Sequence, residues 1–310
     1  MTQIIILNWN GGSATWRCIE AVCALPNTQL TLVDNASTDE SLTLIETSFT
    51  ERNIPFLSLE ESEVDRLRES EANIVIVRAK ANLGFAKGIN LVLRPLLFRK
   101  DLDFVWLLNN DAIAAPDALE KLEAALQAMP KAGFAGSMIM DAQNRAEIQC
   151  FGVQYFPWLS VAKMLHKGEM ISVVNFNEID NDQVDFQHGA SLLVRVQMIR
   201  LVGLLDERFF LYSEEHDWQT RAAKASYSNI RVGESKVFHE GSMSTARDKH
   251  LFYFYYCRSS VFYSRKHHHG FQSIIATLML ASITAIRTRL HPKSMVWAMK
   301  GIAQAWRIIL

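Results

Sequence analysis

The sequence is poor in cysteine, with four among its 310 residues and no CxxC pair. A zinc ribbon and a thiol redox motif are therefore not supported. No internal repeat is visible, which disfavours a solenoid or propeller, and a composition of 49% apolar and 21% charged residues excludes collagen-like and disordered chains. Buried free thiols in a reducing cytoplasm are the expected state of Cys18, Cys23, Cys150 and Cys257.

Several motifs of nucleotide and acyl chemistry are also absent. The chain has no GxxxxGK loop followed by Ser or Thr, so P-loop NTPase chemistry is excluded as far as a sequence can exclude it. No GxGxxG follows the first apolar run, which disfavours a dinucleotide oxidoreductase, and the absence of GxSxG disfavours an α/β-hydrolase. A nucleotidyltransferase is the weakest alternative, because the glycine- and lysine-rich triphosphate loop is missing near the N-terminus.

Acidic residues are missing from the last 62 residues, 249–310, which hold nine Lys and Arg. The preceding 248 residues hold 23 basic and all 33 acidic residues. We expect this basic tail to meet an anion, with phospholipid headgroups and lipid phosphates as the leading candidates. Nucleic acid is disfavoured as a partner because the body is acidic and carries no RNA-binding motif.

Long hydrophobic runs are scarce. The longest uncharged run, Gly270–Ile286, has 17 residues and contains five Ser, Thr or Gln side chains. A membrane-spanning helix needs about 20 predominantly apolar residues, so a spanning helix is disfavoured. The N-terminal run Gln3–Asn8 follows no basic segment and predicts a buried strand rather than a secretory signal.

What the first 140 residues do contain is an alternation of apolar runs and helical patterns. Continuous apolar strands joined by helices predict a parallel sheet covered on both faces. The charged stretch 51–72 predicts a solvated helix or excursion without function. The expected strands are Ile4–Leu7, Leu30–Val33, Ile74–Val77 and Phe104–Leu108, and the expected helices are Ala14–Leu25, Glu40–Phe49, Phe85–Phe98 and Asp117–Ala128, the last with Pro116 in its first turn.

The chain after residue 140 has shorter elements and no Pro-, Gly- or Ser-rich linker before them, so we expect one continuous domain with a C-terminal extension. Expected strands are Ile148–Pro157, Ile171–Phe176 and Ser191–Val194, and expected helices are Arg195–Leu201 and Trp218–Lys224.

Each predicted strand of the first half is followed by Asn, Asp or Gly. In a parallel sheet ligands bind beyond the carboxyl ends of the strands. One such cluster would be ordinary turn chemistry, but four at the same edge favour a binding rim. The clusters are 8–12, 34–39, 82–88 and 109–111.

Two carboxylates in this rim have alternative interpretations. Asp34 can accept hydrogen bonds from a ribose or base, or it can cap the following helix. Asp111 can hold a hard divalent cation beside phosphates, or it too can cap a helix.

Three further carboxylates, Glu214, Glu215 and Asp217, lie within four residues. Their repulsion raises at least one pKa, which suits a general base, whereas the helix dipole accounts equally well for an acidic helix N-terminus. His239 follows an apolar stretch, where a hydrogen-bonded core histidine is more common than a metal ligand.

In order and spacing, these motifs resemble the family 2 glycosyltransferases of the GT-A fold, specifically their rhamnosyltransferase-like branch. The similarity extends to about Arg265. It rests on Ile5–Gly11, Val33–Asp39, Asn82–Asn90, Leu107–Asp111, Gly203–Tyr212, the carboxylate cluster with Arg221 and Ala222, and His239.

The resemblance implies an α/β fold with a Rossmann-like, mostly parallel central sheet and helices on both faces. A catalytic domain would span residues 1–248, with its nucleotide-sugar half at about 1–140 and its acceptor half at about 141–248. A basic, aromatic and helical extension would follow over 249–310.

The resemblance also implies inverting transfer of a sugar from dTDP-rhamnose or a UDP-hexose to an acceptor hydroxyl. Asp111 and His239 would hold Mg²⁺ or Mn²⁺ at the diphosphate, where the metal neutralises developing charge. Glu215 would take the acceptor proton, supported by Glu214 and Asp217. The donor would meet Asn8, Asn10, Asp34, Asn35, Asn82, Gly84, Lys87, Asn109 and Asn110.

Two positions depart from the family pattern. Asn109 stands where the DxD motif has its first Asp, and Glu215 stands where relatives carry the Asp base. Because a misplacement of 1 Å can cost on the order of 100-fold in rate, a catalytically silent nucleotide-sugar-binding or scaffold protein is the alternative.

The aromatic and basic segment 252–269 suits a membrane interface, and a helical pair packed on the catalytic domain is the other interpretation. Interfacial attachment predicts a peripheral protein on the inner face of the bacterial cytoplasmic membrane. Its acceptor would then be a polyprenyl-diphosphate-linked saccharide in O-antigen or capsule synthesis.

Overall fold

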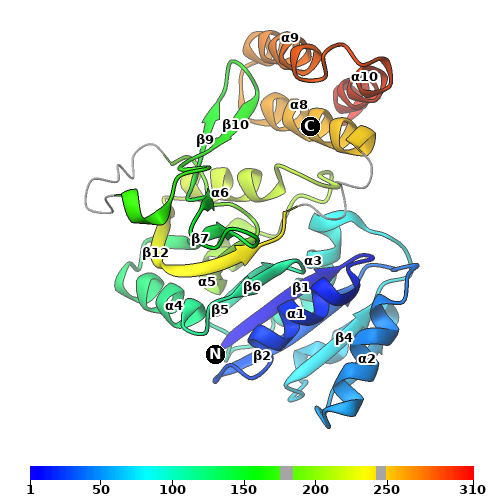
Figure 1. Cartoon of the computed structure of the whole chain (residues 1–310), viewed down its shortest axis with the longest axis vertical. Coiled ribbons are helices and arrows are strands. Elements are labelled where there is room, and N and C mark those ends of the chain that lie inside the picture. Colours follow the sequence, from blue (N-terminus) through cyan, green and yellow to red (C-terminus); the bar gives the residue numbers. More distant parts are fainter. Residues whose placement is uncertain (175–183, 242–248) are drawn as a thin grey trace.

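A computed structural model describes residues 1–174, 184–241 and 249–310. Its main feature is a ten-stranded sheet in the order β3-β4-β2-β1-β5-β11-β7-β12-β6, with β8 paired to β7 (Figure 1). Strands β1 to β5 run parallel, whereas β11 is antiparallel to both of its neighbours. The strands are β1 Thr2–Asn8, β2 Thr28–Asp34, β3 Leu57–Glu60, β4 Ile74–Arg78, β5 Phe104–Asn109, β6 Ala112–Ala114, β7 Ala132–Asp141, β8 Ile148–Cys150, β11 Ser191–Arg195 and β12 Ser228–His239.

Helices cover both faces of this sheet. One face packs against α1 (Gly12–Val22), α2 (Ser41–Glu51) and α4 (Ala118–Ala128). The other packs against α3 (Gly84–Leu96), α5 (Val196–Val202), α6 (Glu214–Lys224) and the 3₁₀ helix η1 (Glu61–Arg68). The predicted mostly parallel α/β architecture is therefore confirmed.

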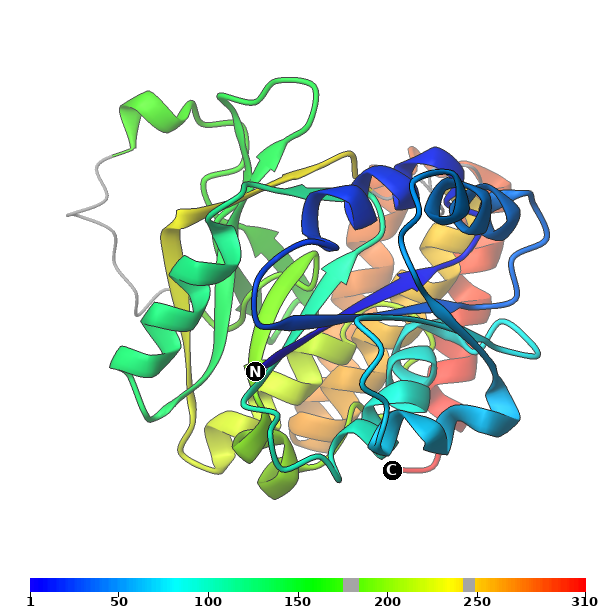
Figure 2. The same ribbon diagram turned by 90° about the horizontal axis from the view of Figure 1, so that it is seen from below.

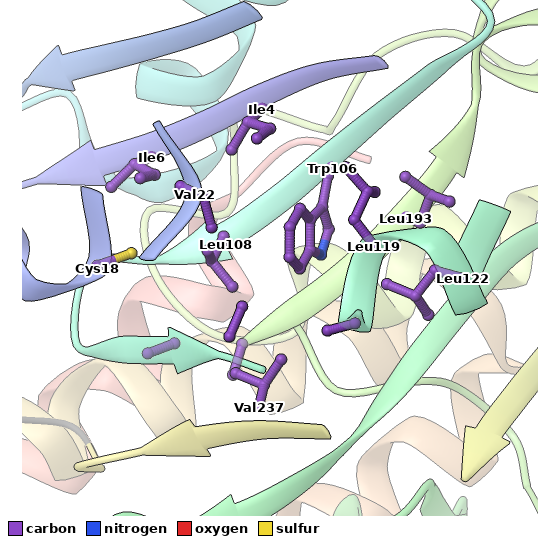
Figure 3. Close-up of a cluster of buried hydrophobic side chains, with 14 of the residues drawn as sticks. Ile4, Ile6, Cys18, Val22, Trp106, Leu108, Leu119, Leu122, Leu193 and Val237 are labelled. Atoms are coloured by element: carbon purple, nitrogen blue, oxygen red, sulfur yellow. The ribbon is translucent and has the colours of Figure 1, made fainter. Parts of the chain in front are cut away.

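The continuous apolar runs follow from this two-sided burial. Ile4 and Ile6 point into the cluster that also holds Val22 and Trp106 (Figure 3). Ile5 between them belongs to the core cluster on the opposite face. Successive strand residues alternate between the faces, so every position of β1 needs an apolar side chain.

The predicted strands and helices of the first half are confirmed within a few residues, with two exceptions. The stretch 51–72 contains η1 but also the edge strand β3, whose four residues are too few to stand out in a charged segment. Pro116 precedes the N-cap residue Asp117 of α4 instead of lying in the first turn.

Two expectations after residue 140 are wrong. The single strand expected over 148–157 is broken at Gly152, whose φ of 92° ends β8 and starts β9 (Val153–Phe156), which pairs with β10 (Val161–Met164). The strand expected over 171–176 is a 3₁₀ turn, η2 (Ile171–Val173), and its last two residues lie outside the described residues.

The C-terminal segment forms the helices α8 (Lys249–His267), α9 (Gly270–Arg287) and α10 (Pro292–Arg307). They lie together at one end of the molecule beside the β9–β10 hairpin (Figure 1), and the view from below places them behind the central sheet (Figure 2). Phe209 and Val161 of the body share a buried core with Phe262, Leu280 and Ile302 of these helices. The helices thus pack on the body.

Candidate active site

The carboxyl ends of β1 and β2 meet in register, with Asn8 opposite Asp34. The Asn8 amide donates to Asp34 Oδ1 at 2.8 Å and to Ser37 Oγ at 3.0 Å, and its Oδ1 accepts from Thr15 at 2.7 Å. Asp34 also accepts the Ser37 backbone N–H. Since α2 begins at Ser41 with Glu40 as its N-cap residue, the helix-cap interpretation of Asp34 is wrong.

Amides join the remaining loops of the rim. Asn10 Oδ1 accepts the backbone N–H of Thr38 at 2.7 Å. Asn35 donates to Asn82 Oδ1 at 3.0 Å, and Asn82 in turn accepts the Gly84 N–H at 2.9 Å. These hydrogen bonds hold the three loops as one surface.

A cavity of about 730 Å³ opens beside this surface, a size typical of ligand sites. The rim and both later motifs contribute to its wall. Of the predicted site residues, those lining it are Asn10, Asn35, Asn82, Gly84, Asn109, Asn110, Asp111, Glu214, Glu215 and His239. Asn8 and Asp34 are buried outside this lining, and Lys87 is exposed on α3 away from it.

Gly84 has a packing role that the sequence did not indicate. Its φ is +76°, and a Cβ at this position would lie 2.4 Å from the carbonyl oxygen of Phe210. That carbonyl accepts the Phe85 N–H at 2.7 Å, so the start of α3 rests directly on the segment that precedes α6.

One corner of the cavity pairs Asp111 with His239. Strand β12 is antiparallel to β6 and sets His239 opposite Ala112, next to Asp111. The distance between His239 Nε2 and Asp111 Oδ1 is 3.1 Å. No helix starts at Asp111, because β6 follows it, so the helix-cap interpretation of Asp111 is also wrong.

The donor chemistry of this corner fits a divalent cation. Gln149 Oε1 lies 2.6 Å from His239 Nδ1, so an Nδ1–H can donate to this oxygen and orient the ring. His239 Nε2 then faces the Asp111 carboxylate oxygen, and a bound cation could be held between these two atoms. Nitrogen and oxygen ligands with a hydrogen-bonded histidine are typical of Mn²⁺ and related ions. Among the described residues no group of three or more His, Cys, Asp and Glu side chains forms a complete metal site.

The carboxylates of Glu214 and Glu215 lie at the N-terminus of α6, on the same cavity. Burial and the neighbouring Glu215 raise the pKa of Glu214 well above its usual 4.5. Burial also raises the pKa of Glu215, against hydrogen bonds from the backbone amides of Glu215, His216 and Gly189. Within the described part of the chain, Oε2 of each carboxylate is buried without a hydrogen-bond partner. Such a pair is suited to accept a proton from a bound hydroxyl.

Asp217 does not line this cavity. It is fully buried and forms ion pairs with Arg221 at 2.9 Å, Lys266 at 2.5 Å and His267 at 2.7 Å. Burial alone would raise its pKa, but the hydrogen bonds from His267 and Lys266 outweigh that effect and hold it below its usual 3.8. The structure therefore separates Asp217 from the two glutamates and joins it to α8.

His188 also lines the cavity and was missed by the sequence reasoning. Its Nδ1 accepts the Ala190 N–H at 3.1 Å, and its ring centroid is 6.1 Å from that of His239. Burial and the nearby His239 lower its pKa to about 4, so the ring is neutral near pH 7. The sequence did offer an indication of this position, since 187–190 directly precede the predicted strand Ser191–Val194. Because β11 is antiparallel to β5, the start of β11 lies at the carboxyl edge of β5.

The cavity is rich in acid. Five carboxylates line it, whereas Lys167 is the single Lys or Arg among its described lining residues. An anionic ligand therefore needs additional positive charge to bind here, which again favours a bound cation. The carboxylates are Asp111, Asp141, Glu147, Glu214 and Glu215.

Comparisons with known proteins agree with this geometry. Residues 3–150 match the model of the family described as Glycosyl transferase family 2. A curated relative, the N-acetylglucosaminyl-diphospho-decaprenol L-rhamnosyltransferase of Mycobacterium tuberculosis, is 25% identical over 244 residues, which cover 72% of this chain and 76% of the relative.

Solved structures share the fold at low identity. The mannosyltransferase PcManGT of Pyrobaculum calidifontis, in complex with GDP-Man and Mn²⁺, has a TM-score of 0.57 and 13% identity, covering 100% of this chain and 76% of that chain. GalNAc-T7 with UDP, GalNAc and Mn²⁺ has a TM-score of 0.58 and 15% identity, covering 98% of this chain and 56% of that chain. With the family match over 3–150, the chain carries a glycosyl transferase family 2 domain and has the GT-A fold.

Proposed function

We propose that this glycosyltransferase is an inverting enzyme that moves a sugar from dTDP-rhamnose or a UDP-hexose to a hydroxyl of a polyprenyl-diphosphate-linked saccharide. The observation that carries the proposal is the shared cavity of Asp111, His239 and Glu215. The two residues proposed to hold a cation and the residue proposed to accept a proton thus line the same cavity. The Mycobacterium tuberculosis relative is an N-acetylglucosaminyl-diphospho-decaprenol L-rhamnosyltransferase, which supports rhamnose as the sugar and a lipid-linked acceptor.

In the proposed reaction, the acceptor oxygen forms a bond to the anomeric carbon as the bond from that carbon to the diphosphate breaks. Glu215 takes the proton of the acceptor hydroxyl, since its carboxylate lines the cavity and has an unpartnered oxygen. Asp111 and His239 would hold Mg²⁺ or Mn²⁺, which supplies neutralisation of the negative charge on the leaving diphosphate. The rim amides Asn82 and Asn110 would orient the donor.

We further propose that the protein attaches peripherally to the inner face of the bacterial cytoplasmic membrane. Helix α9 supports this, because it buries small or polar residues such as Ser273 and Thr284. Several of its large apolar side chains are instead exposed, including Phe271 at 73% and Leu278 at 64%, whereas Leu280 packs in the core shared with the body. Among the described helices, α9 is also the one long and apolar enough to cross a membrane by length and composition, with 28% of that window buried.

Charge points to an anionic bilayer. Residues 249–310, which form the three helices and the turns between them, hold nine Lys and Arg and no Asp or Glu. An apolar helix face flanked by basic residues binds at the boundary of headgroups and acyl chains.

A donor screen tests the proposed reaction. Purified protein is melted with UDP-, dTDP- and GDP-sugars, with and without Mn²⁺, and compared with Asp111→Asn, Glu215→Gln and the exposed control Asp65→Asn. We expect one donor class to raise the melting temperature in the presence of Mn²⁺, because a ligand of the native state stabilises it. This shift is lost in Asp111→Asn and kept in Glu215→Gln and Asp65→Asn.

Transfer to a prenyl-diphosphate N-acetylglucosamine is then measured. We expect Glu215→Gln to lower the rate by about 10²- to 10⁴-fold, the range for loss of a general base. A donor that raises the melting temperature but is not used for transfer to any acceptor would favour the catalytically silent binding protein. No change in melting temperature with any donor would contradict the proposal.

Membrane attachment has its own test. The protein is sedimented with vesicles of pure phosphatidylcholine or with vesicles containing phosphatidylglycerol. Binding that requires the anionic lipid and is lost in the Phe271→Ser, Leu278→Ser double variant is the expected result. Equal binding by the double variant would refute a role for α9.

A further inference from the structure

The segment that leads into α6 has a strained backbone. Tyr212 and Ser213 have φ values of 70° and 67°, in the left-handed region that residues other than glycine rarely adopt. Each such residue costs on the order of 1 kcal/mol or more, and it persists only where its surroundings hold it. Glu214 follows directly, so these two residues set where the carboxylate pair points.

Helix α8 supplies much of that support. Ser259 Oγ donates to the Leu211 carbonyl oxygen at 2.7 Å, and Arg258 Nη2 donates to the Arg208 carbonyl oxygen at 2.9 Å. These two hydrogen bonds give backbone carbonyl groups of the segment 208–211 a donor on α8.

Aromatic contacts add to these bonds. The ring of Tyr255 stacks on Phe210 with centroids 4.8 Å apart and planes at 15°. Phe252 meets Tyr212 edge to face at 5.6 Å. These contacts join one face of α8 to four residues of the segment 208–212.

The same helix reaches the cavity itself. Leu251 and Tyr255 line it, together with Tyr212 and both glutamates of α6. Hence the cavity that holds the carboxylate pair is lined in part by helix α8, which lies beyond the segment 3–150 that matches the family model.

We propose that α8 is a working part of the acceptor site, in which Tyr255 contacts the acceptor saccharide and Ser259 is a positioning residue for the turn that presents Glu214 and Glu215. This inference rests on the proposed function. It identifies the acceptor-side wall as an aromatic one, suited to the apolar face of a sugar ring. It also places that wall on the helix that carries α9 and α10, so a lipid-linked saccharide would approach from that end of the molecule.

Positioning by Ser259 is tested without any substrate. Hydrogen exchange of the backbone amides in 208–216 is compared between wild type, Ser259→Ala, Ser259→Thr and Ser282→Ala. Ser282 is the matched control, because its hydroxyl bonds the Leu278 carbonyl within its own exposed helix. We expect the exchange rate in this segment to rise about fivefold in Ser259→Ala, the effect of one lost hydrogen bond. In Ser259→Thr the rate should be close to that of wild type. Unchanged exchange in Ser259→Ala would overturn the positioning role.

The acceptor role is tested by kinetics with dTDP-rhamnose and a short-chain prenyl-diphosphate N-acetylglucosamine. We expect Tyr255→Leu to raise the acceptor KM at least fivefold while the Kd for dTDP stays within twofold of wild type. Ser259→Ala should lower kcat and leave the same Kd. A wild-type acceptor KM in Tyr255→Leu would refute the contact. Wild-type protein that neither binds any dTDP- or UDP-sugar nor transfers from one would refute the proposed function instead. The hydrogen-exchange result does not depend on that outcome.

Discussion

Neutralising Asp217 should lower the free energy of unfolding without abolishing sugar transfer. Its side chain is 0% exposed, and its three partners Arg221, Lys266 and His267 are 22%, 18% and 4% exposed. Removing one member of a buried ion pair typically costs about 3–5 kcal/mol, because a charge is left without its partner.

The partners of Asp217 keep other contacts when its charge is removed, which places the effect at the low end of this range. Lys266 also pairs with Asp206 at 2.6 Å, and Arg221 donates to the carbonyl oxygens of Val202 and Leu204. We therefore expect Asp217→Asn to lower the free energy of unfolding by about 3 kcal/mol.

The assay is urea unfolding at pH 7, read by tryptophan fluorescence, with Asp65→Asn as the control. Asp65 forms an exposed pair with Arg68, so its loss should change the unfolding free energy by less than about 0.5 kcal/mol. Since the pKa of Asp217 is lowered in the folded state, its stabilisation is complete above the usual 3.8 and is lost as the pH falls through the folded-state pKa. The gap between wild type and Asp217→Asn should therefore narrow below pH 4.

An unfolding free energy of Asp217→Asn within about 0.5 kcal/mol of wild type at pH 7 would refute this reasoning. A loss of transfer as large as that of Glu215→Gln in folded Asp217→Asn protein would show instead that Asp217 acts in the site.

Two further outcomes follow from the cavity. Gly84→Ala places a Cβ 2.4 Å from the Phe210 carbonyl oxygen at a φ of +76°. We therefore expect urea unfolding to show a loss of about 2 kcal/mol in unfolding free energy. The control is the same change at Gly270, which has open space around it and should leave the unfolding free energy nearly unchanged. Because burial raises the pKa values of Glu214 and Glu215, kcat for transfer should rise with pH through an apparent pKa above 4.5. Glu214→Gln should keep this apparent pKa above 4.5, because burial and not the charge of Glu214 raises the pKa of Glu215. An apparent pKa at or below 4.5 in wild type would contradict the assignment.

The sequence alone determined the elements that local pattern encodes. Ile4, Ile5 and Ile6 are buried on alternating faces, so an unbroken apolar run meant a strand covered on both sides. The Asn, Asp and Gly clusters after β1, β2, β4 and β5 came to one edge because parallel strands end together. Short or interrupted elements such as β3 lack enough residues for a period to show.

Tertiary structure alone decided which polar residues meet. His239 faces Asp111 only because β12 pairs with β6 in one register, across more than a hundred residues of sequence. Asp217 does not line the cavity with Glu214 and Glu215, because it pairs with Lys266 and His267 from a helix of the C-terminal segment. Periodicity reports burial relative to near neighbours, whereas contacts between distant segments depend on strand register and helix packing, which no local pattern records.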